Sequence, residues 1–425
     1  MSARTPSGRA AARHGWVQAL VAVLAGLAAM GVVAAFGLWA AGAAGLPGGA
    51  FPRIVAATVV TAVGGVVEPA DDTGGLVAAR AELTVIPLSV TLTGALVTAW
   101  GFLRPLRYRA VAGAGELAGW AGRIAVLWLL ALLGLALAAR QTFSVPLGDD
   151  TLGDLVDLFG LSPRIGFTTA VWPTLLFGLL WLAGVLVLAL LVARGAPLPG
   201  RLLRFRTAVR PAAYAMVVLL LAYVVVGLVV ALVVAATRGH PAGTSAVILL
   251  GLPNLAWPAL TIGLGATWHG RVEGAFGPPM PRPLEQVLRA PDVSAVNLRT
   301  LAEHDGRVWW LVAVDAVLLL GAAFVMAARS PARTRAWRHA VRMAVALALT
   351  VLMICLVGRA SASYGLSVPG IGDLGGALSG ELFLRPRVWT ALGLALLWGL
   401  VAGFLGALLA RPAGRRGATG EEGKR

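Results

Sequence analysis

The chain has 425 residues, of which 58% are hydrophobic and only 13% are charged. Soluble domains carry about 25% charged residues and disordered chains need low hydrophobicity, so the composition excludes both classes. The 35 basic and 19 acidic residues give a net charge of +16, but the arginines lie beside long apolar segments, as in membrane proteins. We therefore predict an all-α polytopic membrane protein that contacts membrane lipids and not nucleic acid.

Nine segments are long and apolar enough to be membrane spans, which need about 20 residues. The first follows Arg4, Arg9 and Arg13, and it is too long for a signal-peptide core, so we predict an uncleaved span. The nine segments are Val17–Ala44, Leu83–Phe102, Ala121–Ala139, Thr168–Ala193, Ala212–Thr237, Ala246–Thr267, Val308–Ala328, Ala340–Gly358 and Val388–Ala410.

Basic residues predominate in five parts of the chain. These alternate with linkers in which acidic residues are about as frequent as basic ones. These parts are the N-terminus, residues 102–123, 194–210 and 329–342, and the tail 411–425. The positive-inside rule assigns them to the cytoplasm and the other linkers to the outside. We therefore predict a multi-pass protein of the plasma membrane with both termini in the cytoplasm.

Nine complete crossings contradict this charge pattern. Counting crossings from the N-terminus places residues 269–307 inside the cell, whereas counting back from the cytoplasmic C-terminus places them outside. The segment Ala246–Thr267 is the best candidate for one that does not cross, since Pro253, Asn254 and Pro258 interrupt it. We expect it to be re-entrant; the alternative is a kinked but complete ninth span. Re-entrance leaves eight transmembrane helices in four hairpins.

Two predicted outer loops share residues when Ser144–Ile165 is laid over Ser367–Val388 without a gap. The shared residues include the pairs Pro146/Pro369, Asp150/Asp373, Pro163/Pro386 and Arg164/Arg387. This match predicts two tandem, parallel membrane halves, residues 1–211 and 212–410, followed by a basic tail, residues 411–425. The first outer loop of each half also holds an extra apolar piece, and the one at Ile54–Val67 is too short to cross, so we expect an interfacial or re-entrant segment.

The SVP…PRV loops and the LPNLAW break resemble the streptophobe family of actinobacterial membrane proteins. The chain is rich in Ala, Gly, Val and Arg and has a single lysine, Lys424, a composition typical of proteins encoded by the GC-rich genomes of actinobacteria. The resemblance implies a membrane location and no assigned activity.

Motifs for catalysis and cofactor binding are largely missing from the sequence. There is no Walker A lysine, HExxH or GxSxG, and the single Cys355 excludes a disulfide and any multi-cysteine metal site. Residues 370–375 match GxGxxG, but no strand is expected before them. We predict no cofactor, no metal and no catalytic residue.

Asp315 is the most informative polar residue, about 10 Å into the span Val308–Ala328. A charge at a helix centre costs about 2.5–3.5 kcal/mol and marks a functional site by default. We predict an intramembrane polar site of Asp315 and Asn254 that could carry a proton or cation step. The alternative is a structural Asp hydrogen-bonded to Tyr223 or Asn254.

Three function classes are compatible with this pattern. A transporter or permease is weakly favoured, because broken segments often mark binding sites. The alternative is a non-catalytic membrane scaffold or assembly partner. A membrane enzyme is less favoured, because only Asn254 and His269 could support Asp315.

Overall fold

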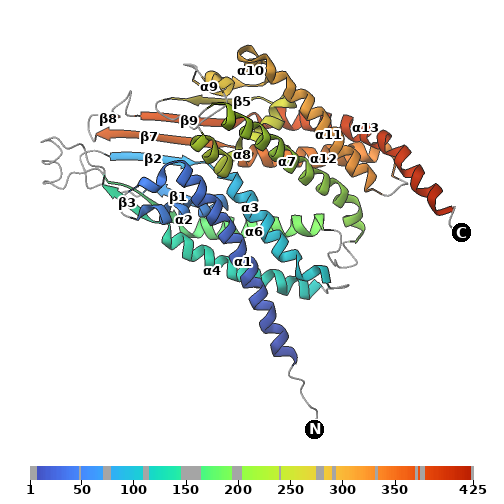
Figure 1. Ribbon diagram of the computed structural model, residues 1–425, viewed down its shortest axis with the longest axis horizontal. Coiled ribbons are helices and arrows are strands. Elements are labelled where there is room, and N and C mark those ends of the chain that lie inside the picture. The colour runs from blue at the N-terminus through green and yellow to red at the C-terminus, as the bar shows by residue number, and fades with distance from the viewer. Residues whose placement is uncertain are drawn as a thin grey trace, which may run out of the picture.

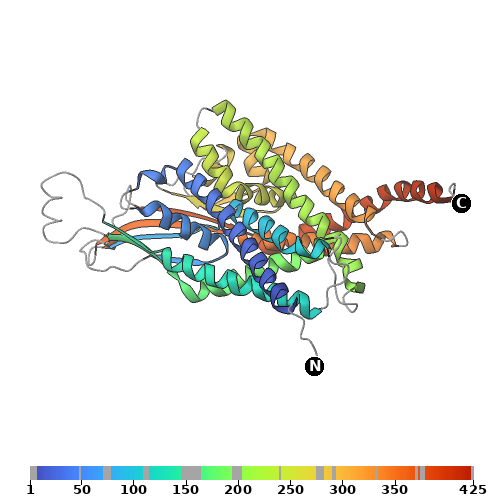
Figure 2. The same ribbon diagram turned by 60° about the horizontal axis from the view of Figure 1, so that its bottom comes forward.

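Long helices form a bundle, and the nine strands of the described part of the chain lie together at one end of it (Figure 1). The computed structural model describes residues 7–46, 49–69, 78–108, 114–144, 164–193, 203–238, 241–273, 282–289, 293–330, 334–368, 372–373 and 379–422. Both views show the two ends of the chain away from the tips of the strands (Figure 2). Below, the end of the bundle that carries the strands is called the strand side.

The helices of the N-terminal part of the chain include one short helix among longer ones. They are α1 (Ser7–Ala40), α2 (Ala50–Ala62), α3 (Leu88–Leu103), α4 (Ala114–Ala138) and α6 (Val171–Val192). The C-terminal part contains α7 (Leu203–Arg238), α8 (Pro241–Gly263), α9 (Arg282–Leu288), α10 (Leu298–His304), α11 (Trp310–Ala328), α12 (Ala336–Val357) and α13 (Val388–Glu422).

In the part of the chain described, eight helices are long and apolar enough to cross a membrane, which confirms a helical, polytopic membrane protein. They coincide with eight of the nine predicted segments. The exception is Leu83–Phe102, because Leu83 and Thr84 belong to a strand and α3 begins only at Leu88. Its 16 residues rise about 24 Å, less than the hydrocarbon thickness of about 30 Å.

The strands, which the sequence did not predict, come from the expected outer linkers. They are β1 (Val66–Pro69), β2 (Ala78–Thr84), β3 (Gln141–Ser144), β4 (Arg164–Ala170), β5 (Trp268–Val272), β6 (Ser294–Val296), β7 (Ala360–Val368), β8 (Gly372–Asp373) and β9 (Ser379–Pro386). One sheet has the order β1-β4-β3, and the other has the order β2-β7-β9-β5-β6 with β8 on β7. All the pairs are antiparallel.

Strand β7 precedes the glycine-rich residues 370–375, contrary to the expectation that no strand would do so. The next long element described is a strand, β9, and not a helix. A dinucleotide fingerprint needs a helix whose N-terminus receives the phosphates, so these residues still lack that context.

Buried side chains form two main clusters. One draws on residues 19–189, from α1 to α6. The other draws on residues 212–402 and takes only Leu88 from the earlier part of the chain. The larger bodies of apolar packing therefore separate mainly between α6 and α7, although Leu250 of α8 packs on the first cluster and Ile86 on the second.

Helices α12 and α13 approach closely through small residues, among them Gly399 and Gly403 of α13, which have the GxxxG spacing typical of close helix packing. A Cβ on Gly399 would meet the backbone N of Ala344 at 2.9 Å, and one on Gly403 would meet the Cα of Ala340 at 2.8 Å. No side chain fits into such gaps, so the two glycines allow the helix backbones to touch.

Candidate functional site

Asp315, the sixth residue of α11, is buried with only 2% of its surface exposed. It lies about 7.5 Å past Trp310, the exposed residue at the strand-side start of the helix. Neither of its carboxyl oxygens has a hydrogen-bond partner among the residues described. A buried, unpaired carboxylate is costly, so this group differs from an ordinary structural aspartate.

The carboxyl group of Asp315 packs directly on the backbone of Gly263, the last residue of α8. A Cβ on Gly263 would lie 2.6 Å from Cγ of Asp315 and 3.0 Å from its Oδ1. Any residue other than glycine would therefore have to displace the carboxyl group. The sequence offered no sign of this contact, because the two residues are far apart in the chain.

No hydrogen bond joins Asn254 to Asp315, the two residues of the predicted polar site. Its Nδ2 donates to the carbonyl of Ile86 at 2.8 Å, and its Oδ1 accepts from the backbone N–H of Leu88 at 3.0 Å. The nitrogen and the oxygen of the Asn254 side-chain amide are thus both hydrogen-bonded to backbone groups at the start of α3. Tyr223 is also no partner of Asp315, because its buried hydroxyl makes no hydrogen bond to any described residue.

The break in α8 lies at Gly251, which has non-helical φ and ψ of −137° and 18°, two residues before Pro253. Ser89 satisfies the backbone there: its hydroxyl donates to the carbonyl of Ile248 at 2.8 Å and accepts from the N–H of Leu252 at 3.1 Å. Irregular backbone at membrane depth requires such partners. Ser89 and Asn254 together therefore fix the broken helix to the start of α3.

Helix α8 begins and ends on the strand side. It starts three residues after the end of α7, and its last residue is followed by β5, which pairs with β9 at Trp268↔Pro386. Its first half contacts α1 at Gly37 and α3 at Ser89, near the strand-side ends of those helices, and Trp257 further along donates to the carbonyl of Leu220 in the middle of α7. A re-entrant segment would follow such a path, and the length and hydropathy of α8 would also allow a crossing.

The short helix α2 ends with the same backbone hydrogen bonds as α8. In α2, Gly64 has φ of 87° and donates to Thr61, and Gly65 donates to Val60. In α8, Gly265 has φ of 97° and donates to Ile262, and Ala266 donates to Thr261. Both are Schellman motifs, which require a left-handed residue, and glycine adopts that conformation most readily. By this match Ala62 is equivalent to Gly263.

A residue near the start of a later helix of the bundle contacts each of these equivalent positions. Thr91, the fourth residue of α3, donates its hydroxyl to the carbonyl of Ala62 at 2.6 Å. Asp315 of α11 packs on Gly263 instead and makes no hydrogen bond to the residues described. The same position thus holds a satisfied hydroxyl in one part of the chain and an unsatisfied carboxyl group in the other.

The repeated loop motif is only partly described. Pro146, Asp150, Pro163 and Pro369 lie outside the described residues. Asp373 belongs to β8 and Pro386 ends β9. Arg387 directly precedes α13, whereas Arg164 is separated from α6 by the rest of β4, so the gap-free match does not hold beyond the loops.

Within the described part of the chain, no group of three His, Cys, Asp or Glu side chains could hold a metal ion. No family model, curated protein or solved structure that was compared with the chain matches it. The arrangement around Asp315 is therefore interpreted from its own geometry.

Proposed function

We propose that the protein is a transporter-like permease in which Asp315 binds and releases a proton during transport. The observation that carries this proposal is the buried carboxyl group of Asp315, which has no hydrogen-bond partner among the described residues and lies at the end of the broken helix α8. Intramembrane acids of this kind recur in proton relays, and broken helices recur at transporter binding sites.

A proton fits this position better than a larger ion. The carboxyl group lies against the backbone of Gly263, and binding a proton neutralises it without needing further space. Releasing the proton leaves a charge in a hydrophobic cluster, so release requires a second arrangement in which water or a donor reaches the group. Alternation between two such arrangements is what proton-coupled transport requires.

The proposal includes two tandem halves, residues 1–211 and 212–410. The matched ends of α2 and α8 and the two separate buried clusters support this division. In both parts of the chain the first strand also pairs with the last, β1 with β4 and β5 with β9. By the positive-inside rule the strand side then lies outside and the termini lie in the cytoplasm of the cell. Membership of the streptophobe family stays a prediction.

Proton flux in proteoliposomes tests this function. The full-length protein is reconstituted with a pH-sensitive dye inside, and decay of an imposed pH gradient is measured for wild type, Asp315→Asn and Asp315→Thr. We expect both variants to slow the decay by at least about tenfold, because neither can carry a proton. Glu303→Gln, which removes an exposed carboxylate paired with Arg299, should leave it unchanged.

Folded yield, measured by size-exclusion chromatography, separates transport from structure. Unchanged yield with lost flux supports the permease. If wild type shows no proton flux, or if the two Asp315 variants lose only yield, the permease proposal fails. The scaffold alternative would then be the better reading.

A further inference from the structure

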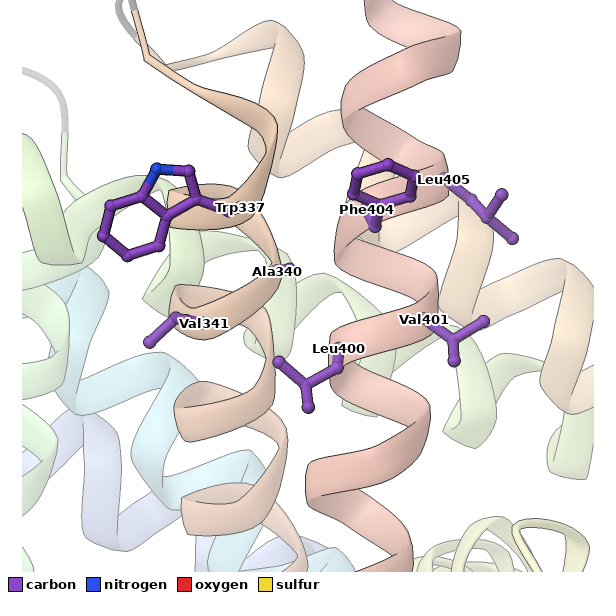
Figure 3. Close-up of a pocket in the computed structure, with 7 residues that line it drawn as sticks. All are labelled: Trp337, Ala340, Val341, Leu400, Val401, Phe404 and Leu405. Carbon is purple, nitrogen blue, oxygen red and sulfur yellow. The ribbon is translucent and has the colours of Figure 1, made fainter.

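An apolar groove runs along the outside of the bundle between α12 and α13 (Figure 3). It has a volume of about 450 Å³. Its walls contain no charged side chain: they are Trp337, Ala340, Val341, Leu400, Val401, Phe404 and Leu405. Because Gly399 and Gly403 bring the two backbones into contact, the larger side chains on both sides rise above a low floor.

The groove opens at membrane depth, because both of its helices are long and apolar enough to cross. Its large side chains, including Trp337 and Phe404, are exposed in the structure. At that depth the surrounding solvent is hydrocarbon. The occupant that this environment supplies is therefore an acyl chain.

Basic residues stand at one end of the groove, on the side opposite the strands. The guanidinium of Arg338 lies 5.5 Å from the ring centre of Trp337, one of the groove walls. Arg335 immediately precedes α12, and the first turn of that helix has no acidic residue. Among the described residues neither arginine forms an ion pair. The salt bridges found among those residues involve other arginines, in β5 or shortly after it: Arg271, Arg289 and Arg299.

We propose that this groove binds one acyl chain of an anionic glycerophospholipid, whose phosphate contacts Arg338 and Arg335. The apolar walls select a hydrocarbon chain, and the positive charges of Arg335 and Arg338 select a negative headgroup at its end. Clusters of basic residues beside membrane helices attract anionic lipids in this way. The site is independent of Asp315, which lies near the opposite end of α11.

Native mass spectrometry of the full-length protein in detergent tests the site, with phosphatidylglycerol and phosphatidylcholine as probes. We expect bound phosphatidylglycerol to exceed phosphatidylcholine for wild type. Arg338→Gln should weaken phosphatidylglycerol binding about fivefold, and Arg335→Gln should do so to a similar extent. Val341→Trp, which fills the groove but keeps both arginines, should also reduce it.

Matched controls separate this site from general lipid contact. Val317→Trp changes an exposed valine of α11 away from the groove, and Arg299→Gln removes an exposed arginine on the strand side. Both should retain wild-type binding. Equal retention of the two lipids, an equal effect of the control variants, or a dimer that Val341→Trp dissociates in place of lipid loss would overturn the proposal.

Discussion

Helix α2 and helix α8 both enter from the strand side and stop at a left-handed glycine, Gly64 in one and Gly265 in the other. Their surroundings match further, since a Cβ on Gly64 would meet Phe177 of α6 and a Cβ on Gly265 would meet Leu394 of α13. Phe177 and Leu394 are each the seventh residue of their helix. The two helices therefore reach a similar depth against equivalent neighbours.

The difference lies in what packs on their last turn. The hydroxyl of Thr91 satisfies a carbonyl at the end of α2, which is the ordinary way to fix a helix end. At the end of α8, Asp315 satisfies nothing among the residues described. A threonine suffices for the architecture at the end of α2, so the carboxyl group of Asp315 is free for the proton step proposed above.

Thr91→Asp is the change with the largest expected effect on stability. It would place a second carboxyl group at a buried helix end and remove the bond to Ala62. We expect a loss of about 2.5–3.5 kcal/mol in the free energy of unfolding, the insertion cost of such a group. Unfolding in mixed micelles measures it, with Thr91→Val, which should lose only about 1 kcal/mol, as the control. Equal losses in the two variants would mean that the position tolerates a carboxyl group.

Gly263→Ala should have a smaller effect, about 1–3 kcal/mol, because the new methyl group must displace the Asp315 carboxyl group. The same unfolding measurement applies. In an Asp315→Ser background the shorter side chain makes room, and most of the loss should disappear. If the loss is the same in both backgrounds, the contact between Gly263 and Asp315 does not set the shape of this site.

The mildest change tests whether the segment that follows α8 lies outside the cell. A cysteine at Ser294 in a Cys355→Ser background should be labelled by a membrane-impermeant thiol reagent in intact cells. Ser294 begins β6, which pairs with β5 directly after α8. Labelling only after lysis would place this strand in the cytoplasm and would contradict both the re-entrance of α8 and the proposed orientation.

The spans, the close packing at Gly399 and Gly403 and the burial of Asp315 follow from local sequence, because each depends on hydropathy or small side chains within one helix. The strands do not, since β2 and β7 pair residues such as Arg80 and Gly365 that lie far apart in the chain. The contact of Asp315 with Gly263 could not be predicted for the same reason, because the two residues lie far apart in the chain. A helix break was predicted near Pro253, but its anchors, Ser89 and the start of α3, come from another hairpin.

One strand pairing also bears on how the protein can be made. Strand β2 from the first linker pairs along its length with β7, which lies near the C-terminus (Figure 1). During synthesis the backbone N–H and C=O groups that β2 offers to β7 therefore stay unpaired until residue 368 has emerged from the ribosome. Unpaired strand edges of this kind promote aggregation. A truncated gene product that ends before α12 would keep that edge exposed, so the N-terminal half is a poor unit for separate expression. Coexpression with the C-terminal half would supply the missing strand.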